Sequence, residues 1–167
     1  YLNAIRVWVS SPAADAVDDV WSELCAARCQ RLWWWSIHIV RIDARFDAVV
    51  KQHWQRFRTL QFVMCTFDDA GIEAVAYCEN LVELRICSAT TKLTDAQVMT
   101  LVSMLRKLDR LDLRSSLAAD VSVATFAAMG SLPHLERIAL QFNGFFGDAD
   151  RAAVFASAAQ RAKNGAR

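Results

Sequence analysis

The sequence carries almost no net charge and has no long hydrophobic run. Its 19 lysines and arginines nearly balance 18 aspartates and glutamates, so the formal net charge is +1. A dedicated nucleic-acid binder usually has a strongly basic domain, and this balance disfavours that class unless the charge gathers on one face. The best apolar stretch, residues 32–40, is interrupted by Ser36 and His38 and is too short to cross a bilayer. We therefore expect a soluble chain with no membrane span, and its 54 % apolar composition suffices for a compact core.

The usual signatures of catalysis are also missing. The sequence contains no Walker loop, dinucleotide-binding glycine fingerprint, nucleophile elbow or zinc-protease helix. The glycine-rich piece NGFFG, at residues 143–147, directly follows an apolar strand pattern, which favours a turn over a phosphate cradle. We therefore expect no enzymatic activity, no cofactor and no small-molecule substrate.

The cysteines cannot all be paired, because their number is odd and they lie in apolar sequence surroundings. They are Cys25, Cys29, Cys65, Cys78 and Cys87. This usage favours a reducing intracellular compartment. The three histidines show no spacing that would complete a metal site with them, so we expect no metal and interpret the cysteines as small buried hydrophobic residues.

The chain begins at Tyr1, with no initiator Met and no signal-like segment. We therefore expect that preceding residues have been cleaved, truncated or left out. An organelle-targeting presequence is one explanation, and the mitochondrial matrix is a compartment that would suit it.

What the chain does contain is a short apolar pattern, LxxLxL, that occurs six times. Its positions are Leu2/Ile5/Val7, Leu32/Trp35/Ile37, Phe57/Leu60/Phe62, Leu81/Leu84/Ile86, Leu108/Leu111/Leu113 and Leu135/Ile138/Leu140. Successive starts are 30, 25, 24, 27 and 27 residues apart. A nearly constant period of this size indicates an array of repeated supersecondary units.

Apolar residues spaced three and four apart fill three of the segments between these triplets. The stripes are Val17/Val20/Trp21/Leu24/Cys25, Phe46/Val49/Val50/His53/Trp54/Phe57 and Val98/Leu101/Val102/Leu105. Residues able to cap a helix N-terminus stand at Ser11-Pro12, Asp43, Asp68, Thr94 and Asp120. We therefore expect one strand and one helix to alternate six times.

With these features the chain resembles the leucine-rich-repeat family, in particular the cysteine-containing, ribonuclease-inhibitor-like and F-box-associated type with a full helix in each repeat. The closest local matches are VMCTFDDAGIEAVAYCENLVELRICS (residues 63–88) and TKLTDAQVMTLVSMLRKLDRLDLRSS (residues 91–116). The resemblance implies an α/β solenoid of about six strand–helix repeats, with a parallel sheet on the concave side and helices on the convex side.

The family places Cys or Asn three residues after the last apolar strand position, where the side chain hydrogen-bonds the backbone of the turn. Cys65 and Asn143 match that position. The equivalent positions elsewhere hold Ser10, Val40, Ala89 and Ser116. We therefore expect these four turns to be less regular.

The two ends of the array differ. Residues 148–163 have the pattern of a last amphipathic helix that begins at an aspartate and ends at Asn-Gly, and such a helix would cover the end of the array. The chain is thus divided into a repeat array, residues 1–147, and a C-terminal capping helix and tail, residues 148–167. No comparable cap precedes Leu2, so we expect a missing segment or a partner to cover that edge.

Alternation along the strands predicts which side chains face outward on the concave side. When the triplets point inward, the concave face has an aromatic half and an arginine-rich half. The candidate protein-binding residues are Trp8, Trp34, His38, Arg6, Arg85, Arg110, Arg114 and Arg137. Trp and Arg are enriched at interface hot spots, so we expect an adaptor or structural subunit that binds protein, within a larger assembly, through this face.

Other interpretations stay open at this point. Glu83 with Arg110, and Arg85 with Asp112, would form a solvated ladder across the strands that binds nothing. A separate alternative places the interface on the convex helices or on the edge strand. Alternatively, the arginine-rich half contacts RNA, as a subunit of a ribonucleoprotein or mitochondrial complex.

The resemblance itself adds two further settings. Leucine-rich repeats serve as substrate-recognition arrays of F-box-type ubiquitin ligases, although no F-box-like segment is present in this sequence. The chain is also loosely similar to the small mitochondrial leucine-rich proteins related to ATP synthase subunit s, with which it shares size and the strand end Ile42-Asp43-Ala44.

Overall fold

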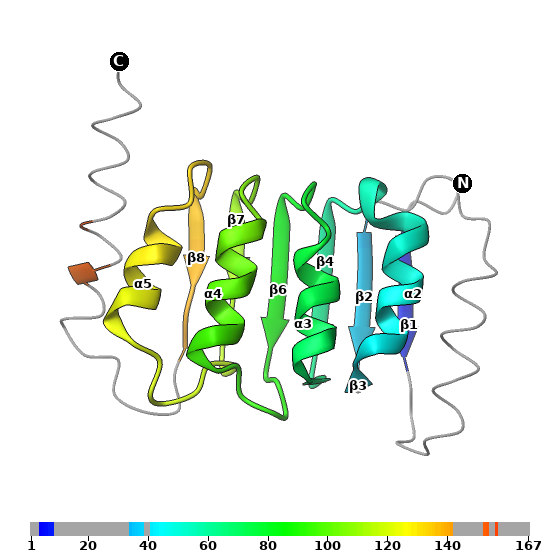
Figure 1. The fold of residues 1–167 in the computed structure, drawn as a ribbon, viewed down its shortest axis with the longest axis horizontal. Coiled ribbons are helices and arrows are strands. Elements are labelled where there is room, and N and C mark those ends of the chain that lie inside the picture. Colours follow the sequence, from blue (N-terminus) through cyan, green and yellow to red (C-terminus); the bar gives the residue numbers. More distant parts are fainter. Residues whose placement is uncertain (1–3, 9–33, 39–40, 142–151, 154–155, 157–167) are drawn as a thin grey trace.

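The computed structural model describes residues 4–8, 34–38, 41–141, 152–153 and 156. These residues form a mixed α/β structure with two layers, a parallel sheet and a row of helices (Figure 1). The stripe expected as a helix at residues 17–25 lies outside the described residues, as do the turns expected at Ser10, Val40 and Asn143.

Six parallel strands form the main sheet. They are β1 (Ala4–Trp8), β2 (Trp34–His38), β4 (Thr59–Val63), β6 (Glu83–Cys87), β7 (Arg110–Asp112) and β8 (Arg137–Ala139). Their order across the sheet is β1-β2-β4-β6-β7-β8, which is also their order along the chain. Each strand therefore pairs only with the strands that precede and follow it in this sheet.

The apolar triplets set the register of all six strands. The second residue of each triplet occupies one row across the sheet, namely Ile5, Trp35, Leu60, Leu84, Leu111 and Ile138. A slip of one residue would turn the apolar set of a strand outward, so burial of one face fixes this alignment. Wherever the burial of these side chains is described, they are buried or partly buried.

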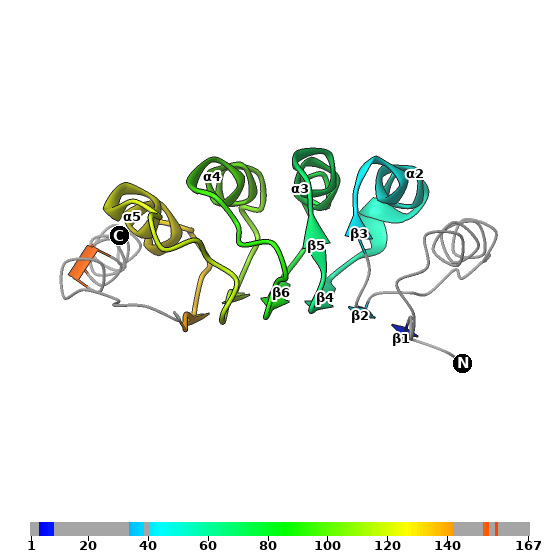
Figure 2. The ribbon, with the colours of Figure 1, turned by 90° about the horizontal axis from the view of Figure 1, so that it is seen from below.

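The helices cover one face of the sheet in a single row (Figure 2). They are α2 (Ala44–His53), α3 (Asp69–Ala76), α4 (Asp95–Met104) and α5 (Val123–Gly130), and a short 3₁₀ helix, η1 (Trp54–Arg56), follows α2. Two two-residue strands, β3 (Arg41–Ile42) and β5 (Thr66–Phe67), form a second small parallel sheet just before α2 and α3.

Side chains at three of the expected caps hold the helix N-termini. Asp68 accepts a hydrogen bond from the Gly71 amide, Thr94 forms a capping box with Gln97, and Asp43 accepts from the Arg45 amide. The expected cap at Asp120 is wrong, because α5 begins two residues later and Ser122 accepts the bond from the Thr125 amide. Ser122 is an equally good cap residue, and propensity alone does not choose between the two.

The core lies between the sheet and the helices and is largely aliphatic. Leu60, Leu84 and Ile86 are completely buried. At the α2 end, Phe62 makes edge-to-face contacts with Phe46 and Phe67, with ring centroids 5.8 and 5.3 Å apart. Edge-to-face packing of this kind adds about 0.5 to 1.5 kcal/mol beyond the burial of area.

One glycine marks the closest approach of a helix to the chain beneath it. A Cβ atom added to Gly71, in α3, would overlap the carbonyl oxygen of Ile42 in β3. The same carbonyl oxygen accepts the Asp68 amide at 3.3 Å. Only glycine lets α3 begin this close to β3.

The turns after three strands have the same geometry. Met64, Ser88 and Ser115 have φ of 55°, 54° and 55°, and each lies four residues after the aligned apolar position of its strand. The amide of each donates to a carbonyl at or just beyond the end of the next strand: Cys87 is the last residue of β6, and Arg114 and Gln141 lie two residues past β7 and β8. The left-handed conformation therefore recurs with the period of the triplets.

The expected irregularity at Ala89 and Ser116 is wrong. Both are buried, as is Cys65 at the equivalent position. The Ser116 hydroxyl donates to the Ile86 carbonyl at 2.7 Å and accepts the Ala89 amide at 3.1 Å. The Cys65 thiol makes the corresponding contact with the Ile37 carbonyl at 3.5 Å. Ser116 thus makes the bond that Cys65 makes at the equivalent position. Its hydroxyl also accepts the amide of the neighbouring turn, where Ala89 has no polar side chain of its own.

Most of the expected C-terminal helix, residues 148–163, lies outside the described residues. Ala152, Ala153 and Ala156 are helical. Ala153 is partly buried against the core.

Candidate binding face

The six-stranded sheet has one face that α2–α5 do not cover, which we call the open face (Figure 2). Burial alternates along the strands as a sheet with one buried face requires. In β6, Glu83, Arg85 and Cys87 are partly exposed, whereas Leu84 and Ile86 are buried. The open face therefore carries the side chains that the alternation rule assigns to it.

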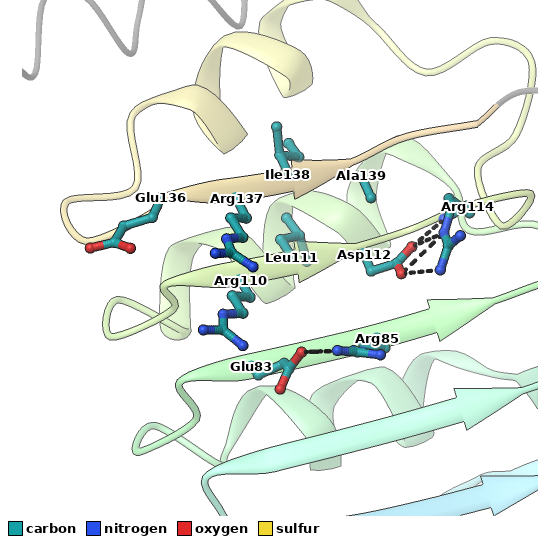
Figure 3. A pocket seen from close by; sticks show the side chains of 10 residues that line it. All are labelled: Glu83, Arg85, Arg110, Leu111, Asp112, Arg114, Glu136, Arg137, Ile138 and Ala139. Atoms are coloured by element: carbon teal, nitrogen blue, oxygen red, sulfur yellow. Dashed lines mark hydrogen bonds and ion pairs between the residues drawn. The ribbon is translucent and has the colours of Figure 1, made fainter.

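Four of the predicted site residues lie together at the β6–β8 end of this face. Arg85, Arg110, Arg114 and Arg137 line an open depression of about 670 Å³ (Figure 3). The other lining residues are Glu83, Leu111, Asp112, Glu136, Ile138 and Ala139. Ala139 is opposite Asp112 in the register, and its short side chain leaves room beside the longer ones.

The acids and arginines pair along the strands, and the expected cross-strand pairs are wrong. Glu83 is opposite Arg110 and Arg85 is opposite Asp112, as expected. However, the Arg85 Nη2 atom lies 2.5 Å from Glu83, and the Arg114 Nη2 atom lies 2.7 Å from Asp112. Residues two apart share a face of a strand, and a long guanidinium reaches back to its own strand.

The Asp112–Arg114 pair is the more complete of the two. Arg114 donates from both Nε and Nη2 to the carboxylate, and its backbone amide donates as well. Burial acts to raise the pKa of Asp112, but these hydrogen bonds outweigh it and hold that pKa below the usual carboxyl value. The carboxylate raises the pKa of Arg114 in turn. Both groups are fully charged at neutral pH, and they form an ion pair with one another.

Arg110 and Arg137 differ, because neither is held by a strong hydrogen bond to an acid. They are directly opposite each other on β7 and β8. The Arg110 Nε atom lies 3.3 Å from Asp109 Oδ1. That oxygen nevertheless has no hydrogen-bond partner among the described residues, so the contact has the distance of an ion pair without hydrogen-bond geometry. The Arg137 side chain has no ion pair within the described part of the chain, and Figure 3 shows no bond from it to the lining residues.

The aromatic half is described at the level of the backbone. Trp8 is opposite His38, Arg6 is opposite Ser36, and Trp34 is opposite Ala4 on one side and Thr59 on the other. The side chains of Trp8, Trp34 and Arg6 lie outside the described part of the structure. The register shows that the two tryptophan positions are not opposite one another.

His38 is partly buried, and a 2.8 Å hydrogen bond joins its Nε2 atom to the Ser36 hydroxyl. Ser36 and Thr59 also occupy open-face positions but are buried. The middle of the open face therefore offers less exposed polar surface than alternation alone predicts.

The described cysteines are all free thiols. Cys65 and Cys78 are buried, and burial raises the pKa of the Cys78 thiol well above its usual value, so that it stays protonated. Cys87 is partly exposed on the open face.

Within the described residues no group of three or more His, Cys, Asp or Glu side chains is placed to hold a metal ion. None of the described helices is long and apolar enough to cross a membrane.

Hydrogen bonds that link neighbouring helices were not predicted from the sequence. Asp95, in the first turn of α4, accepts from the Ser122 amide and hydroxyl and from the Thr125 hydroxyl at the start of α5. Asp69, in the first turn of α3, accepts from Gln97 in α4 at 2.8 Å. The signal was an aspartate directly after each cap residue, which is also a common choice for the helix dipole alone.

The helix side carries a second, smaller depression. Its volume is about 250 Å³, and it is lined by Glu73, Ala76, Tyr77, Thr100 and Met104. Tyr77 and Met104 are 59 % and 40 % exposed, so this groove is more apolar than the open face.

Comparison of the sequence with models of known protein families gives no match, and comparison with curated proteins gives none at a significant level.

Proposed function

We propose that this chain is a leucine-rich-repeat solenoid of about six strand–helix repeats whose function is to bind protein without catalysis. The shared register of six apolar triplets and the recurring left-handed turns support the repeat architecture. The strands lie on the inner side of a shallow arc, with the helices on its outer side (Figure 2). Arrays of this kind bind through an extended inner surface.

The observation that carries the functional proposal is the cluster of four arginines around one depression on the open face. Arginine is among the residues most enriched at interface hot spots, because it buries a long apolar stem and still donates several hydrogen bonds. Three carboxylates, Glu83, Asp112 and Glu136, line the same depression. This mixture suits a protein surface better than a polyanion, which the acids would repel.

A site-specific cross-linking experiment tests the proposal. A photoreactive amino acid is placed at Gln61 or Ala139, on the open face, and at Ser103, on α4, as the matched control. We expect adducts with a protein partner from the two open-face positions and none from Ser103. Adducts from Ser103 alone would move the interface to the helices, and cross-linked RNA from the open face would replace the protein partner by a nucleic acid.

A further inference from the structure

We propose that Arg110 and Arg137 form a clamp for one carboxylate, so that the open face takes a partner segment through an Asp or Glu side chain. This inference rests on the proposed protein-binding function and names the chemistry that the binding face recognises.

The two arginines are neighbours of like charge. Arg110 is directly opposite Arg137, and adjacent strands in a sheet are about 4.8 Å apart. Like charges directly opposite one another on a sheet face are destabilising. Figure 3 shows both side chains on the same side of β7 and β8, with Glu136 extending away from Arg137. An anion bound between the two guanidinium groups would relieve this repulsion.

The nearby acids do not serve as that anion. Glu83 is opposite Arg110, but it bonds to Arg85 Nε at 2.7 Å. Asp112 is held by three donors of Arg114. Asp109 approaches Arg110 only at 3.3 Å and without hydrogen-bond geometry. The donors of Arg110 and Arg137 are therefore the ones most available to a ligand.

The surroundings select the size and charge of that ligand. The occupied pair Arg85–Glu83 lies on β6, and the pair Arg114–Asp112 lies at the C-terminal end of β7; each pair is close to neutral. The excess positive charge of the depression is thus confined to the clamp. Guanidinium groups bind carboxylates in a planar, two-point geometry, whereas a phosphate chain would bring further charges against Glu83, Asp112 and Glu136.

The test is a selection of short linear peptides from a random display library. The library is panned in parallel on the unchanged protein, on Arg110→Gln/Arg137→Gln, and on Lys51→Gln/Arg106→Gln, which removes the same charge from exposed positions away from the open face. We expect the unchanged protein and the control to enrich peptides with Asp or Glu at one position. We expect the clamp variant to lose that preference. Equal melting temperatures of the three proteins establish that none of them is misfolded.

A double-mutant cycle on the best peptide then measures the contact itself. Exchanging the acidic residue of the peptide for its amide should weaken binding to the unchanged protein about ten-fold or more. The same exchange should have little effect on binding to Arg110→Gln/Arg137→Gln. An acid-independent affinity for the unchanged protein, or an acid preference that survives in the clamp variant, would overturn the inference.

The remaining outcomes separate this inference from the proposed function. If no peptide is enriched, the clamp is rejected, while cross-linking from Gln61 and Ala139 still decides whether the open face binds protein. If a single-stranded RNA binds instead, with an affinity that falls steeply with salt and is lost in the clamp variant, the carboxylate is rejected in favour of phosphate. Protein adducts from the open face, with peptides that lack acidic residues, would leave the proposed function standing and remove the clamp alone.

Discussion

At the scale of single residues, Ser116 holds two turns with one hydroxyl group. Its O–H group donates to the Ile86 carbonyl, its oxygen accepts from the Ala89 amide, and the serine side chain is completely buried. A buried backbone group that loses its partner bears the full cost of its desolvation. Removal of this hydroxyl therefore leaves two backbone groups without that partner.

We expect Ser116→Ala to lower the free energy of unfolding by about 1 to 3 kcal/mol, as measured by urea denaturation. Ser103→Ala is the control, because its hydroxyl is exposed and bonds only within α4. That change should stay within about 0.5 kcal/mol. Equal stabilities for the two variants would mean that the turn backbone does not depend on the Ser116 hydroxyl.

Gly71 offers a test in which the sign of the effect is informative. Replacing an exposed helical glycine by alanine ordinarily stabilises a protein by up to about 1 kcal/mol. Here the new methyl group would overlap the Ile42 carbonyl, so we expect Gly71→Ala to destabilise by about 1 to 3 kcal/mol or more. Thermal unfolding decides between the two signs, and a stabilised variant would show that α3 and β3 are not in close contact.

At the scale of elements, the strands were the most predictable part of the chain. A triplet such as Leu108/Leu111/Leu113 specifies both the strand and its inward face, because side chains alternate with a period of two. Local hydrogen bonds were harder to predict from the sequence: the N-cap of α5 is Ser122 and not the predicted Asp120. Arg85 shows why the site was predicted only in part. The predicted position of Arg85 opposite Asp112 was correct, but its flexible side chain forms an ion pair with Glu83 on its own strand.

Substitution of two adjacent residues of β7 should change the stability to very different extents. Leu111 is 3 % exposed, so Leu111→Asp would bury an unpaired charge, and we expect a loss of more than about 4 kcal/mol, which abolishes folding. Arg110 is on the open face, so Arg110→Gln should stay within about 0.5 kcal/mol. Circular dichroism and urea denaturation compare the two variants. A folded Leu111→Asp protein would mean that the faces of β7 are reversed.

At the scale of the whole molecule, acid stability depends on carboxylates spread over three parts of the chain. Hydrogen bonds from Arg45 hold the pKa of Asp43 below its usual value of 3.8, and those from Thr125 and Ser122 do the same for Asp95. Asp112 has a lowered pKa as well. In each case the unfolded chain binds protons at a higher pH than the folded chain. The resulting stabilisation is complete above the unfolded-state pKa and is lost as the pH falls through the folded-state value.

We therefore expect the melting temperature to fall below about pH 4, where these carboxylates begin to take up protons. The variant Asp43→Asn/Asp95→Asn/Asp112→Asn should be less stable at neutral pH and should lose less of its remaining stability on acidification. Melting curves across the acid range measure both effects. Parallel pH profiles for the variant and the unchanged protein would assign acid sensitivity to other groups.

The order of strands in the main sheet is the same as their order in the chain. Every strand pairing therefore closes a loop of similar, modest length, and no pairing depends on a segment from the far end of the sequence. Loop closure costs grow with the separation of the paired residues, and folding slows when distant contacts must form first. During synthesis, each new strand of such a chain can pair with the strand made just before it. No strand of the main sheet has to stay unpaired until a distant part of the sequence has been synthesised.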